Sequence, residues 1–449
     1  MKYISSYKKY TLTQNSSVSW LGVVPSHWKL LRLKNIFHIH KNISGELGHD
    51  VLSITQKGIK LKDTTSGDGQ LSMDYSKYQL VSLGDFAMNH MDLLTGYVDI
   101  SSFAGVTSPD YRVFKLIHQE SVPRFWLYIL QLCYKLKIFY PLGQGAAQIG
   151  RWRLPAEGFN QFVSAVPTQD EQQKIANFLD HETAKIDTLI EKQQQLIKLL
   201  KEKRQAVISQ AVTKGLNPDA PMKDSGVEWL GEVPEHWSMR KFKHVSRIVR
   251  GGSPRPAGDP LLFNGSYSPW VTVAEITGDE EIYLKQTDSF LTKLGSEQCR
   301  VFKTGTLLYS NSGATLGVPK ILAINANAND GVVGFEKLSV DITYAYYFLL
   351  FQTADLRERT KQGSGQPNLN TDIVGNMEIL LPPKEEVEEI LQRIDQFESA
   401  YKMLLVLSNS TVSKLQERRT ALISAAVTGK IDVRNWQPPE PTSTPSTDA

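Results

Sequence analysis

The feature that most constrains this chain is a long-range internal duplication. Residues 20–28 read WLGVVPSHW and residues 229–237 read WLGEVPEHW, with 7 of 9 positions identical. Residues 200–213 and 415–428 read LKEKRQAVISQAVT and LQERRTALISAAVT, with 9 of 14 positions identical. The separations, 209 and 215 residues, are too long for a solenoid unit. The pattern therefore predicts two tandem copies of a whole domain plus a helix, with a pseudo-two-fold relation.

Between the repeated motifs the two halves diverge. Segments of roughly 30–165 and 240–380 match poorly, although both show the same order of expected elements. Like scaffolds that carry unlike variable regions are typical of a protein that recognises two different half-targets. We expect each variable region to be mixed α/β, with strands near 51–55, 111–114 and 306–309, helices near 122–139 and 343–360, and strands at 162–166 and 379–381.

Two long helices are predicted to follow these regions. Thr168 and Glu171 fit a capping box at the start of the first helix, and Lys214 with Gly215 supplies its end. The second helix starts after Pro382 and Pro383 (residues 382–383). Apolar residues recur with gaps of four and three along both segments, which predicts an antiparallel coiled coil. The alternative is two amphipathic helices that each pack on their own domain.

The expected seam of this coiled coil is a set of seven mutually buried side chains. They are Ile186, Leu189, Leu196 and Leu200 in the first helix and Tyr401, Leu404 and Leu415 in the second. The predicted boundaries are a first α/β domain at 1–165, the first helix at 166–214, a second α/β domain at 215–380, the second helix at 381–430, and a disordered tail at 431–449.

Composition excludes several classes of protein. The chain has 41% hydrophobic and 22% charged residues, which is ordinary for a soluble globular protein. No transmembrane run and no secretory signal are present, so we expect a cytoplasmic location. Two cysteines, Cys133 and Cys299, are too few for a disulfide scaffold or a Cys-rich zinc site.

The repeated WLGxVPxHW element has two interpretations. Trp28 or Trp237 could stack on a nucleic-acid base. The interpretation that we favour is a rigid plug that docks the start of each domain on the long helices, because an element shared by both halves cannot discriminate two targets.

The candidate nucleic-acid contacts are basic residues near the start of each half and amides in two Gly/Gln loops. Basic runs contact phosphates, and Gln, Asn and Arg pair with base edges. A solvated surface and flexible turns are the alternatives. The first half contributes Lys34, Lys41, Gln144, Gln148, Arg151 and Arg153, with Asn89 and Arg112 as weaker candidates. The second half contributes Arg240, Lys241, Lys243, Arg247, Arg250, Arg255, Gln366, Asn368 and Asn370, with Asn311 and Lys320 as weaker candidates.

Motifs of catalysis are missing from the sequence. It contains no GxxxxGK[ST], no Asn/Asp-Pro-Pro-aromatic tetrapeptide, no nuclease-type acidic cluster, no HExxH and no Cys/His metal pattern. We therefore expect no catalytic residue, no metal site and no cofactor in this chain.

At this point the chain resembles the specificity (S) subunits of type I restriction–modification systems. The resemblance rests on the doubled WLGxVPxHW, on VPTQDEQQKIANFLD at 166–180 with LPPKEEVEEILQRID at 381–395, and on the repeated helix ends. It covers about 15–433, whereas residues 88–103 depart from the strand-rich stretch found at 309–327. The resemblance implies two target-recognition domains held apart by an antiparallel coiled coil.

The resemblance also implies a function and partners. The chain would bind double-stranded DNA at a bipartite, gapped site and position two modification (M) subunits, which use S-adenosylmethionine to methylate adenine N6. With two restriction (R) subunits, the complex would cleave DNA using ATP and Mg²⁺. The competing hypotheses are that the chain is itself a methyltransferase or nuclease, or that it is a protein-binding coiled-coil tether without DNA readout.

Overall fold

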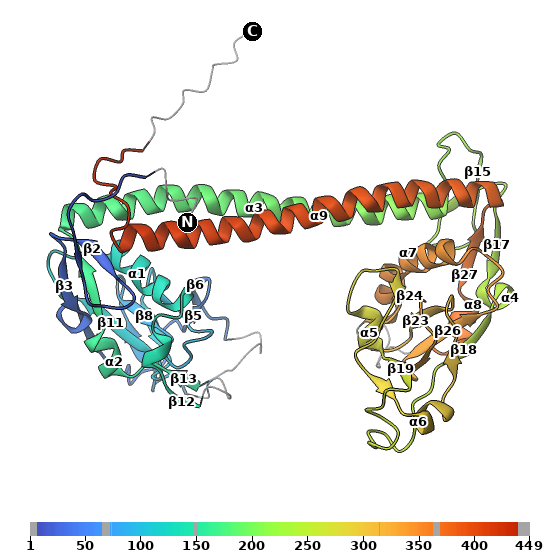
Figure 1. Ribbon diagram of the computed structural model, residues 1–449, viewed down its shortest axis with the longest axis horizontal. Helices are drawn as coiled ribbons and strands as arrows, with labels where there is room; N and C mark the ends of the chain where they lie inside the picture. The colour runs from blue at the N-terminus through green and yellow to red at the C-terminus, as the bar shows by residue number, and fades with distance from the viewer. Residues whose placement is uncertain are drawn as a thin grey trace, which may run out of the picture. The chain divides into compact units, whose positions relative to one another are not determined.

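The structure is a computed structural model that describes residues 7–64, 72, 74–146, 151–313, 315–361 and 369–438 (Figure 1). The chain divides into two compact units. Unit 1 is residues 1–194 with 409–449, and unit 2 is residues 195–408. Each unit therefore combines one predicted α/β domain with part of both long helices.

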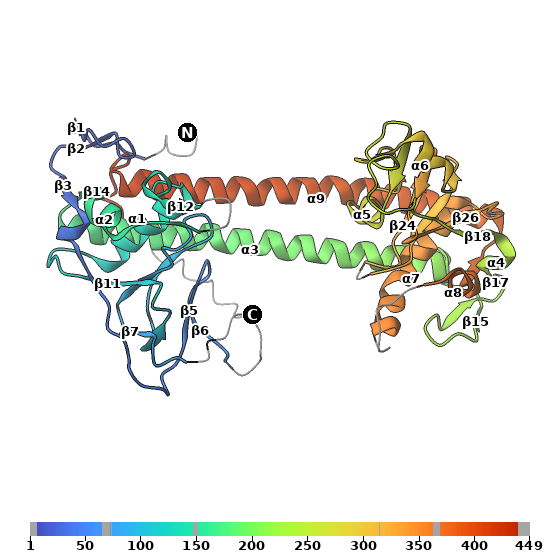
Figure 2. The same cartoon turned by 90° about the horizontal axis from the view of Figure 1, so that it is seen from below.

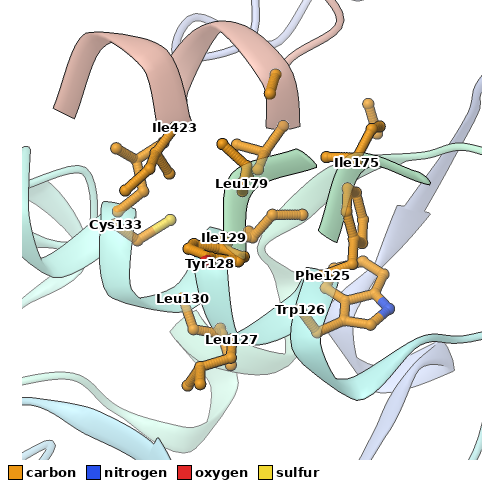
Figure 3. Packing of buried hydrophobic residues seen from close by; sticks show 14 of the residues in the cluster. Phe125, Trp126, Leu127, Tyr128, Ile129, Leu130, Cys133, Ile175, Leu179 and Ile423 are labelled. Atoms are coloured by element: carbon orange, nitrogen blue, oxygen red, sulfur yellow. The ribbon is translucent and has the colours of Figure 1, made fainter. Parts of the chain in front are cut away.

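Unit 1 is built on a four-stranded antiparallel sheet of order β4-β11-β8-β9. Its strands are β4 (Phe37–His40), β11 (Arg112–Leu116), β8 (Phe86–Met88) and β9 (Val98–Ile100). Helix α1 (Pro123–Lys135) buries nine of its 13 residues. Figure 3 shows its side chains meeting Ile175 and Leu179 of helix α3 (Gln169–Lys214) and Ile423 of helix α9 (Lys384–Val427). The core of this unit thus includes the long helices.

Short hairpins surround the sheet of unit 1. The remaining elements are β1 (Thr13–Asn15), β2 (Val23–Pro25), β3 (Lys29–Arg32), η1 (Leu33–Asn35), β5 (Leu52–Thr55), β6 (Gly58–Leu61), β7 (Gln79–Val81), β10 (Gly105–Thr107), η2 (Tyr140–Leu142), β12 (Gln144–Ala146), β13 (Arg151–Arg153), α2 (Ala156–Gln161) and β14 (Val163–Val166).

Unit 2 contains a five-stranded sheet of order β18-β26-β23-β24-β20 and a four-stranded sheet of order β21-β19-β25-β22. The first sheet comprises β18 (Arg247–Arg250), β26 (Val332–Glu336), β23 (Leu307–Ser310), β24 (Pro319–Leu322) and β20 (Tyr283–Leu284). The second comprises β21 (Phe290–Leu291), β19 (Ser268–Val271), β25 (Ala326–Ala328) and β22 (Val301–Phe302). The remaining elements are β15 (Met222–Asp224), β16 (Glu232–Pro234), β17 (Ser238–Lys241), α4 (Phe242–Val245), α5 (Val273–Thr277), α6 (Lys293–Glu297), α7 (Ile342–Lys361), α8 (Thr371–Asn376) and β27 (Glu378–Leu381).

The two units share a three-stranded core that the sequence does not reveal. Strands β4-β11-β8 in unit 1 and β18-β26-β23 in unit 2 have the same order and are antiparallel at every contact. The expected strands and helices are found, although α1 ends at Lys135, four residues before the predicted end. The predicted mixed α/β class is confirmed.

Helices α3 and α9 pack together in an antiparallel manner and lie side by side in Figures 1 and 2. In unit 1, the Arg419 guanidinium lies 2.8 Å from the Asp187 carboxylate. In unit 2, Nε of Arg204 donates to Oε1 of Glu398 at 2.6 Å, and Glu386 approaches Gly215. The predicted pairing of two long helices is therefore confirmed.

The predicted seam is displaced by one residue in the middle of the helices. Leu189, Leu196 and Leu404 are 48%, 41% and 44% exposed, so these side chains are not mutually buried as expected. Ile190, Ile197 and Leu405 occupy the partly buried positions instead, while Ile186 and Tyr401 are buried, and Leu200 and Leu415 are partly buried. The physical reason is that adjacent apolar residues at these points allow two seams with the same spacing, and packing buries Ile190 and Ile197 rather than Leu189 and Leu196.

The predicted tail starts too early. Residues 431–436 pack on unit 1: Ile431 and Val433 are buried, and the Trp436 ring lies 5.4 Å from the Phe178 ring. The amide of Asp432 donates to the carbonyl of Lys8 at 2.7 Å. Alternating apolar side chains hold this segment to the core, and residues 439–449 lie outside the described residues.

The repeated nine-residue element is a plug, as the favoured interpretation predicts. Trp28 and Trp237 are buried, and their indole nitrogens donate to Glu171 at 3.1 Å and Glu386 at 2.8 Å. These carboxylates lie in the first turns of α3 and α9. Each plug also covers the glycine that ends the other long helix, Gly429 against Trp28 and Gly215 against Trp237. Both glycines have a positive φ, which a glycine adopts without strain.

The predicted capping box is only half formed. The amide of Glu171 lies 3.4 Å from the Thr168 hydroxyl, but the Glu171 carboxylate does not turn back to the helix start. It accepts hydrogen bonds from the plug instead, because three donors converge on it there.

Candidate nucleic-acid interface

In unit 1, one edge of the sheet collects side chains from several distant segments. The carboxyl ends of β4 and β8 meet the amino end of β11 at this edge, because β11 is antiparallel to both. Lys41 follows β4, His90 lies two residues after β8, and Arg112 begins β11. The β12–β13 hairpin is attached here: the amide of Leu154 donates to the His90 carbonyl at 2.9 Å.

This edge is electropositive. Burial, and then the charges of Arg112, Arg153 and Lys41, lower the pKa of His90 to about 3, so the imidazole is neutral at physiological pH. Burial lowers the pKa of Arg112 to about 10, which still leaves it charged. Lys41 and Arg153 are exposed. Two predicted nucleic-acid contacts from distant parts of the sequence therefore lie near the same imidazole.

The hairpin presents polar side chains on one face and anchors the other. Gln144 lies opposite Arg153 in the ladder, and both are exposed. Trp152, on the opposite face, donates from Nε1 to the carbonyl of Tyr140 at 2.9 Å. A Cβ at Gly143 would lie 2.2 Å from that nitrogen, so only glycine permits this packing. The predicted Gly/Gln loop therefore begins with a strand, β12, that pairs with β13. This pairing places Gln144 and Arg153 side by side.

In unit 2, the corresponding edge is formed by β18, β23 and β26. Arg250 ends β18, Asn311 follows β23, and Asp330 lies just before β26. The amide of Leu369 donates to the Asn311 carbonyl at 2.7 Å, as Leu154 does to His90 in unit 1. In unit 1 the segment that follows α1, and in unit 2 the segment that follows α7, is therefore hydrogen-bonded to the equivalent edge of the three-stranded core.

The edge of unit 2 is organised around Asp330. Nε of Arg250 donates to the Asp330 carbonyl at 2.7 Å, and the Ser253 hydroxyl donates to its carboxylate at 2.8 Å. The Ser253 hydrogen bond, aided by the Arg250 and Arg255 charges, lowers the pKa of Asp330. Among the described atoms, Oδ1 of buried Asn311 has no hydrogen-bond partner.

The predicted site residues fall into distinct groups. Lys41, Gln144, Arg153, Arg250 and Arg255 are exposed at or next to the two edges. Arg240, Lys243 and Arg247 are also exposed, but Arg247 begins β18, at the opposite end of the strand from Arg250. Lys34 likewise precedes β4, and Lys241 is half-buried. Each basic run is therefore divided between two ends of a strand.

Three weaker candidates lie in the interior. The Arg112 guanidinium donates to the Leu154 carbonyl at 2.9 Å and lies 5.2 Å from the centre of the Phe159 ring. Lys320 is buried and pairs with Asp279. Asn311 is fully buried. Their placement corrects the expectation of direct contact, because a side chain buried inside the fold is not exposed to a phosphate or a base.

Of the remaining amides, Asn89 and Asn370 use their side chains locally. Each accepts a backbone hydrogen bond, from Met91 at 3.2 Å and from Ile373 at 2.8 Å. Gln148, Gln366 and Asn368 lie outside the described residues, and Arg151 is described only by its backbone, which pairs with Ala146. Sequence reasoning missed His90, Ser253 and Asp330, for which no motif or repeat gave a signal.

The described ranges contain neither a metal-binding cluster nor a membrane-spanning helix. In these ranges no group of three or more His, Cys, Asp or Glu side chains is arranged to hold a metal ion. Nor does any helix there have the length and apolar character needed to cross a membrane.

Together, the fold and the two edges define a class: a protein with two α/β units whose long helices pair with each other. Residues 234–404 match the family described as "Type I restriction modification DNA specificity domain". Specificity subunits of type I restriction enzymes are similar in sequence. The MjaIX subunit of Methanocaldococcus jannaschii is 27% identical over 38% of this chain and 39% of its own length. The EcoKI subunit of Escherichia coli is 23% identical over 62% of this chain and 59% of its own.

A solved structure shares the fold. A chain from a study of complex assembly and conformational transition of the type I restriction–modification system aligns with a TM-score of 0.68 at 14% identity. That alignment covers 91% of this chain and 99% of that chain. Over residues 234–404 the chain thus matches the type I restriction–modification DNA specificity domain, and it is similar in sequence to specificity subunits of such systems. The matched segments span about two fifths to two thirds of the curated relatives.

Proposed function

We propose that this chain is the DNA-recognition subunit of a type I restriction–modification complex and reads a bipartite, gapped site in double-stranded DNA. The observation that carries the proposal is the equivalent edge in both units, placed on a shared three-stranded core but lined by different residues. Exposed Lys and Arg there provide the salt-dependent part of DNA affinity, and the exposed amide of Gln144 in unit 1 can read a base edge.

The proposal includes the partners and their cofactors. Two M subunits would bind S-adenosylmethionine and methylate adenine N6, and two R subunits would use ATP and Mg²⁺ for cleavage, in the cytoplasm. The chain itself would supply recognition and assembly without catalysis. This division is supported by the relatives, all named as specificity subunits.

A candidate surface for those partners lies on the long helices of unit 2. Met403, Val406 and Leu407 are exposed and, at spacings of three and four, share one face of α9. Leu196 and Leu199 are exposed on α3 of the same unit. Exposed apolar side chains grouped in this way mark protein–protein interfaces.

Mapping of adenine methylation in host DNA, with the gene present and deleted, tests the proposed function. We expect one bipartite motif to lose methylation on deletion. Exchange of residues 30–165 for those of a relative should change one specified half of that motif and leave the other intact. A change in both halves, or in neither, would contradict recognition by separate units.

A finer test uses matched charge variants in the full complex. Lys41→Ala and Arg153→Ala should each lower the slope of log affinity against log salt by about 1. Lys115→Ala is the control, because Lys115 is exposed on β11 but lies toward the other end of the strand from Arg112. An equal effect of all three variants would show that this edge is not the DNA contact.

A further inference from the structure

The two plugs allow an internal comparison, because their carboxylates are used differently. In unit 1, Glu171 accepts hydrogen bonds from Trp28, from the hydroxyl of Tyr10 and, at 2.9 Å, from His27. The ring of Tyr10 lies 5.9 Å from both the His27 and Trp28 rings. Tyr10 therefore closes the plug of unit 1, and the Glu171 side chain is only 3% exposed.

Unit 2 repeats the arrangement without the tyrosine. Glu386 accepts from Trp237 at 2.8 Å and pairs with His236 at 2.5 Å, but its side chain is 37% exposed. Beside it is a pocket of about 230 Å³ lined by Gly215, Leu216, Asn217, Ala220, Pro234, His236, Glu386 and Ile390, with Lys214 and Glu389. All of these residues belong to unit 2.

The ladder registers identify the residue that replaces the tyrosine. Thr13–Asn15 pairs with Val23–Pro25 as Met222–Asp224 pairs with Glu232–Pro234, a constant offset of 209 residues. The offset extends to the preceding loop, where Leu12 and Pro221 accept equivalent hydrogen bonds. Tyr10 therefore corresponds to Asp219, which is exposed. A carboxylate cannot donate to a second carboxylate, so Asp219 supplies no equivalent of the phenol.

We infer that the pocket beside Glu386 is a docking site for a tyrosine side chain presented by a partner protein. The phenol would donate its hydroxyl to Glu386 and pack between His236 and Trp237, as Tyr10 does in unit 1. In unit 1, the Arg434 guanidinium lies 5.0 Å from the centre of the Tyr10 ring. We therefore expect a basic residue near the partner's tyrosine to suit the pocket of unit 2. This inference concerns protein binding and does not depend on DNA recognition.

The occupant is indicated by the chain itself. Lys8 and Lys9 lead into Tyr10 at the plug of unit 1, and the Lys8 carbonyl accepts a hydrogen bond from the Asp432 amide. Burial and Glu171 raise the pKa of Tyr10, which keeps it a hydrogen-bond donor. In a partner segment of the same chemistry, lysines followed by tyrosine, the phenol satisfies Glu386 and a lysine can pair with Glu389, in a lining whose two carboxylates outnumber its one lysine, Lys214.

The test uses the full chain and the capped peptide Lys-Lys-Tyr-Thr, which copies residues 8–11. Saturation-transfer NMR should detect contact with the tyrosine ring, and the indole N–H resonance of Trp237, assigned with Trp237→Phe, should shift on titration. The matched peptide Lys-Lys-Phe-Thr lacks only the hydroxyl and should bind about tenfold more weakly, as expected for loss of a hydrogen bond to a charged acceptor.

Protein variants separate this site from general attraction of a basic peptide. Glu386→Ala should abolish the titration shift, whereas Glu385→Ala, an exposed neighbour outside the pocket, should leave peptide affinity within twofold. Circular dichroism checks that both variants remain folded. Equal binding of the Tyr and Phe peptides, an unshifted Trp237 resonance, or equal loss in both variants would overturn the inference. Methylation of host DNA by the Glu386→Ala complex then reports separately on the proposed function.

Discussion

One carboxylate in each unit, Glu171 or Glu386, accepts the hydrogen bonds that join the plug to a long helix. The two carboxylates differ in burial and in the number of donors that they accept. Glu171 is buried and accepts from three side chains, whereas Glu386 is partly exposed and accepts from two. Removal of a buried acceptor leaves its donors unsatisfied, which costs more than the same change near solvent.

We therefore expect Glu171→Gln to lower the free energy of unfolding by about 2 kcal/mol. Glu386→Gln, which lies nearer to solvent, should cost less than about 1 kcal/mol. Urea unfolding followed by tryptophan fluorescence compares the two variants directly. Equal losses of unfolding free energy in the two variants would contradict the view that burial and the third donor distinguish the plugs. Tyr10→Phe isolates the contribution of that third donor, the Tyr10 hydroxyl.

His90 should make stability depend on pH. Its pKa is lowered to about 3 in the folded chain, mainly by burial, while the unfolded chain titrates near 6.5. Below about pH 6.5 the unfolded state binds more protons, so stability falls with pH down to about 3, by at most about 1.4 kcal/mol per pH unit. His90→Gln should flatten this dependence between pH 4 and pH 6 in unfolding measurements. An unchanged slope would show that His90 is not the titrating group.

At the scale of the helices, a buried ion pair interrupts the apolar seam. Arg204 and Glu398 are bonded within the seam of unit 2, and the Arg204 guanidinium also lies 5.2 Å from the centre of the Tyr401 ring. Glu280, from the turn before β20, lies 3.7 Å from Arg204, so the pair also connects the helices to the α/β part of the unit. Such a pair fixes register better than apolar contacts, which tolerate sliding.

Removal of one residue of the Arg204–Glu398 pair should therefore lower the stability strongly, whereas replacement of both by apolar residues should not. We expect Glu398→Leu to destabilise by about 3 kcal/mol, and the double variant Arg204→Met/Glu398→Leu to recover most of that loss. Thermal unfolding of the single and double variants completes the cycle. Glu202→Ala, in the exposed pair with Lys198, is the control and should change stability by less than about 0.5 kcal/mol. A double variant as unstable as the single one would contradict this account.

At the scale of the whole molecule, the long helices are predicted to set the gap in the recognised DNA. Each heptad contributes about 10 Å of helix. At about 3.4 Å of rise per base pair, removal of one facing heptad from each helix should shorten the gap by about three base pairs. Methylation mapping with the shortened chain measures this change. A functional variant with an unchanged gap would show that the helices do not act as the spacer.

The sequence by itself determined the duplicated plan, the mixed α/β class and the two long helices. These follow from local signals, because motif repeats and apolar spacing are read along the chain without knowledge of contacts. Even the role of the WLGxVPxHW plug could be inferred, since an element present in both halves belongs to the common framework.

Only the tertiary structure decided which residues share a surface. Lys41, His90 and Arg153 meet because sheet register brings three distant segments to one edge, and no local pattern encodes that register. Likewise, the choice between Leu189 and Ile190 in the seam depends on how each helix is rotated about its axis. Neighbouring residues point about 100° apart around a helix, so only one of the two can face the seam. Both fit the apolar spacing of the sequence, and the tertiary packing selects one.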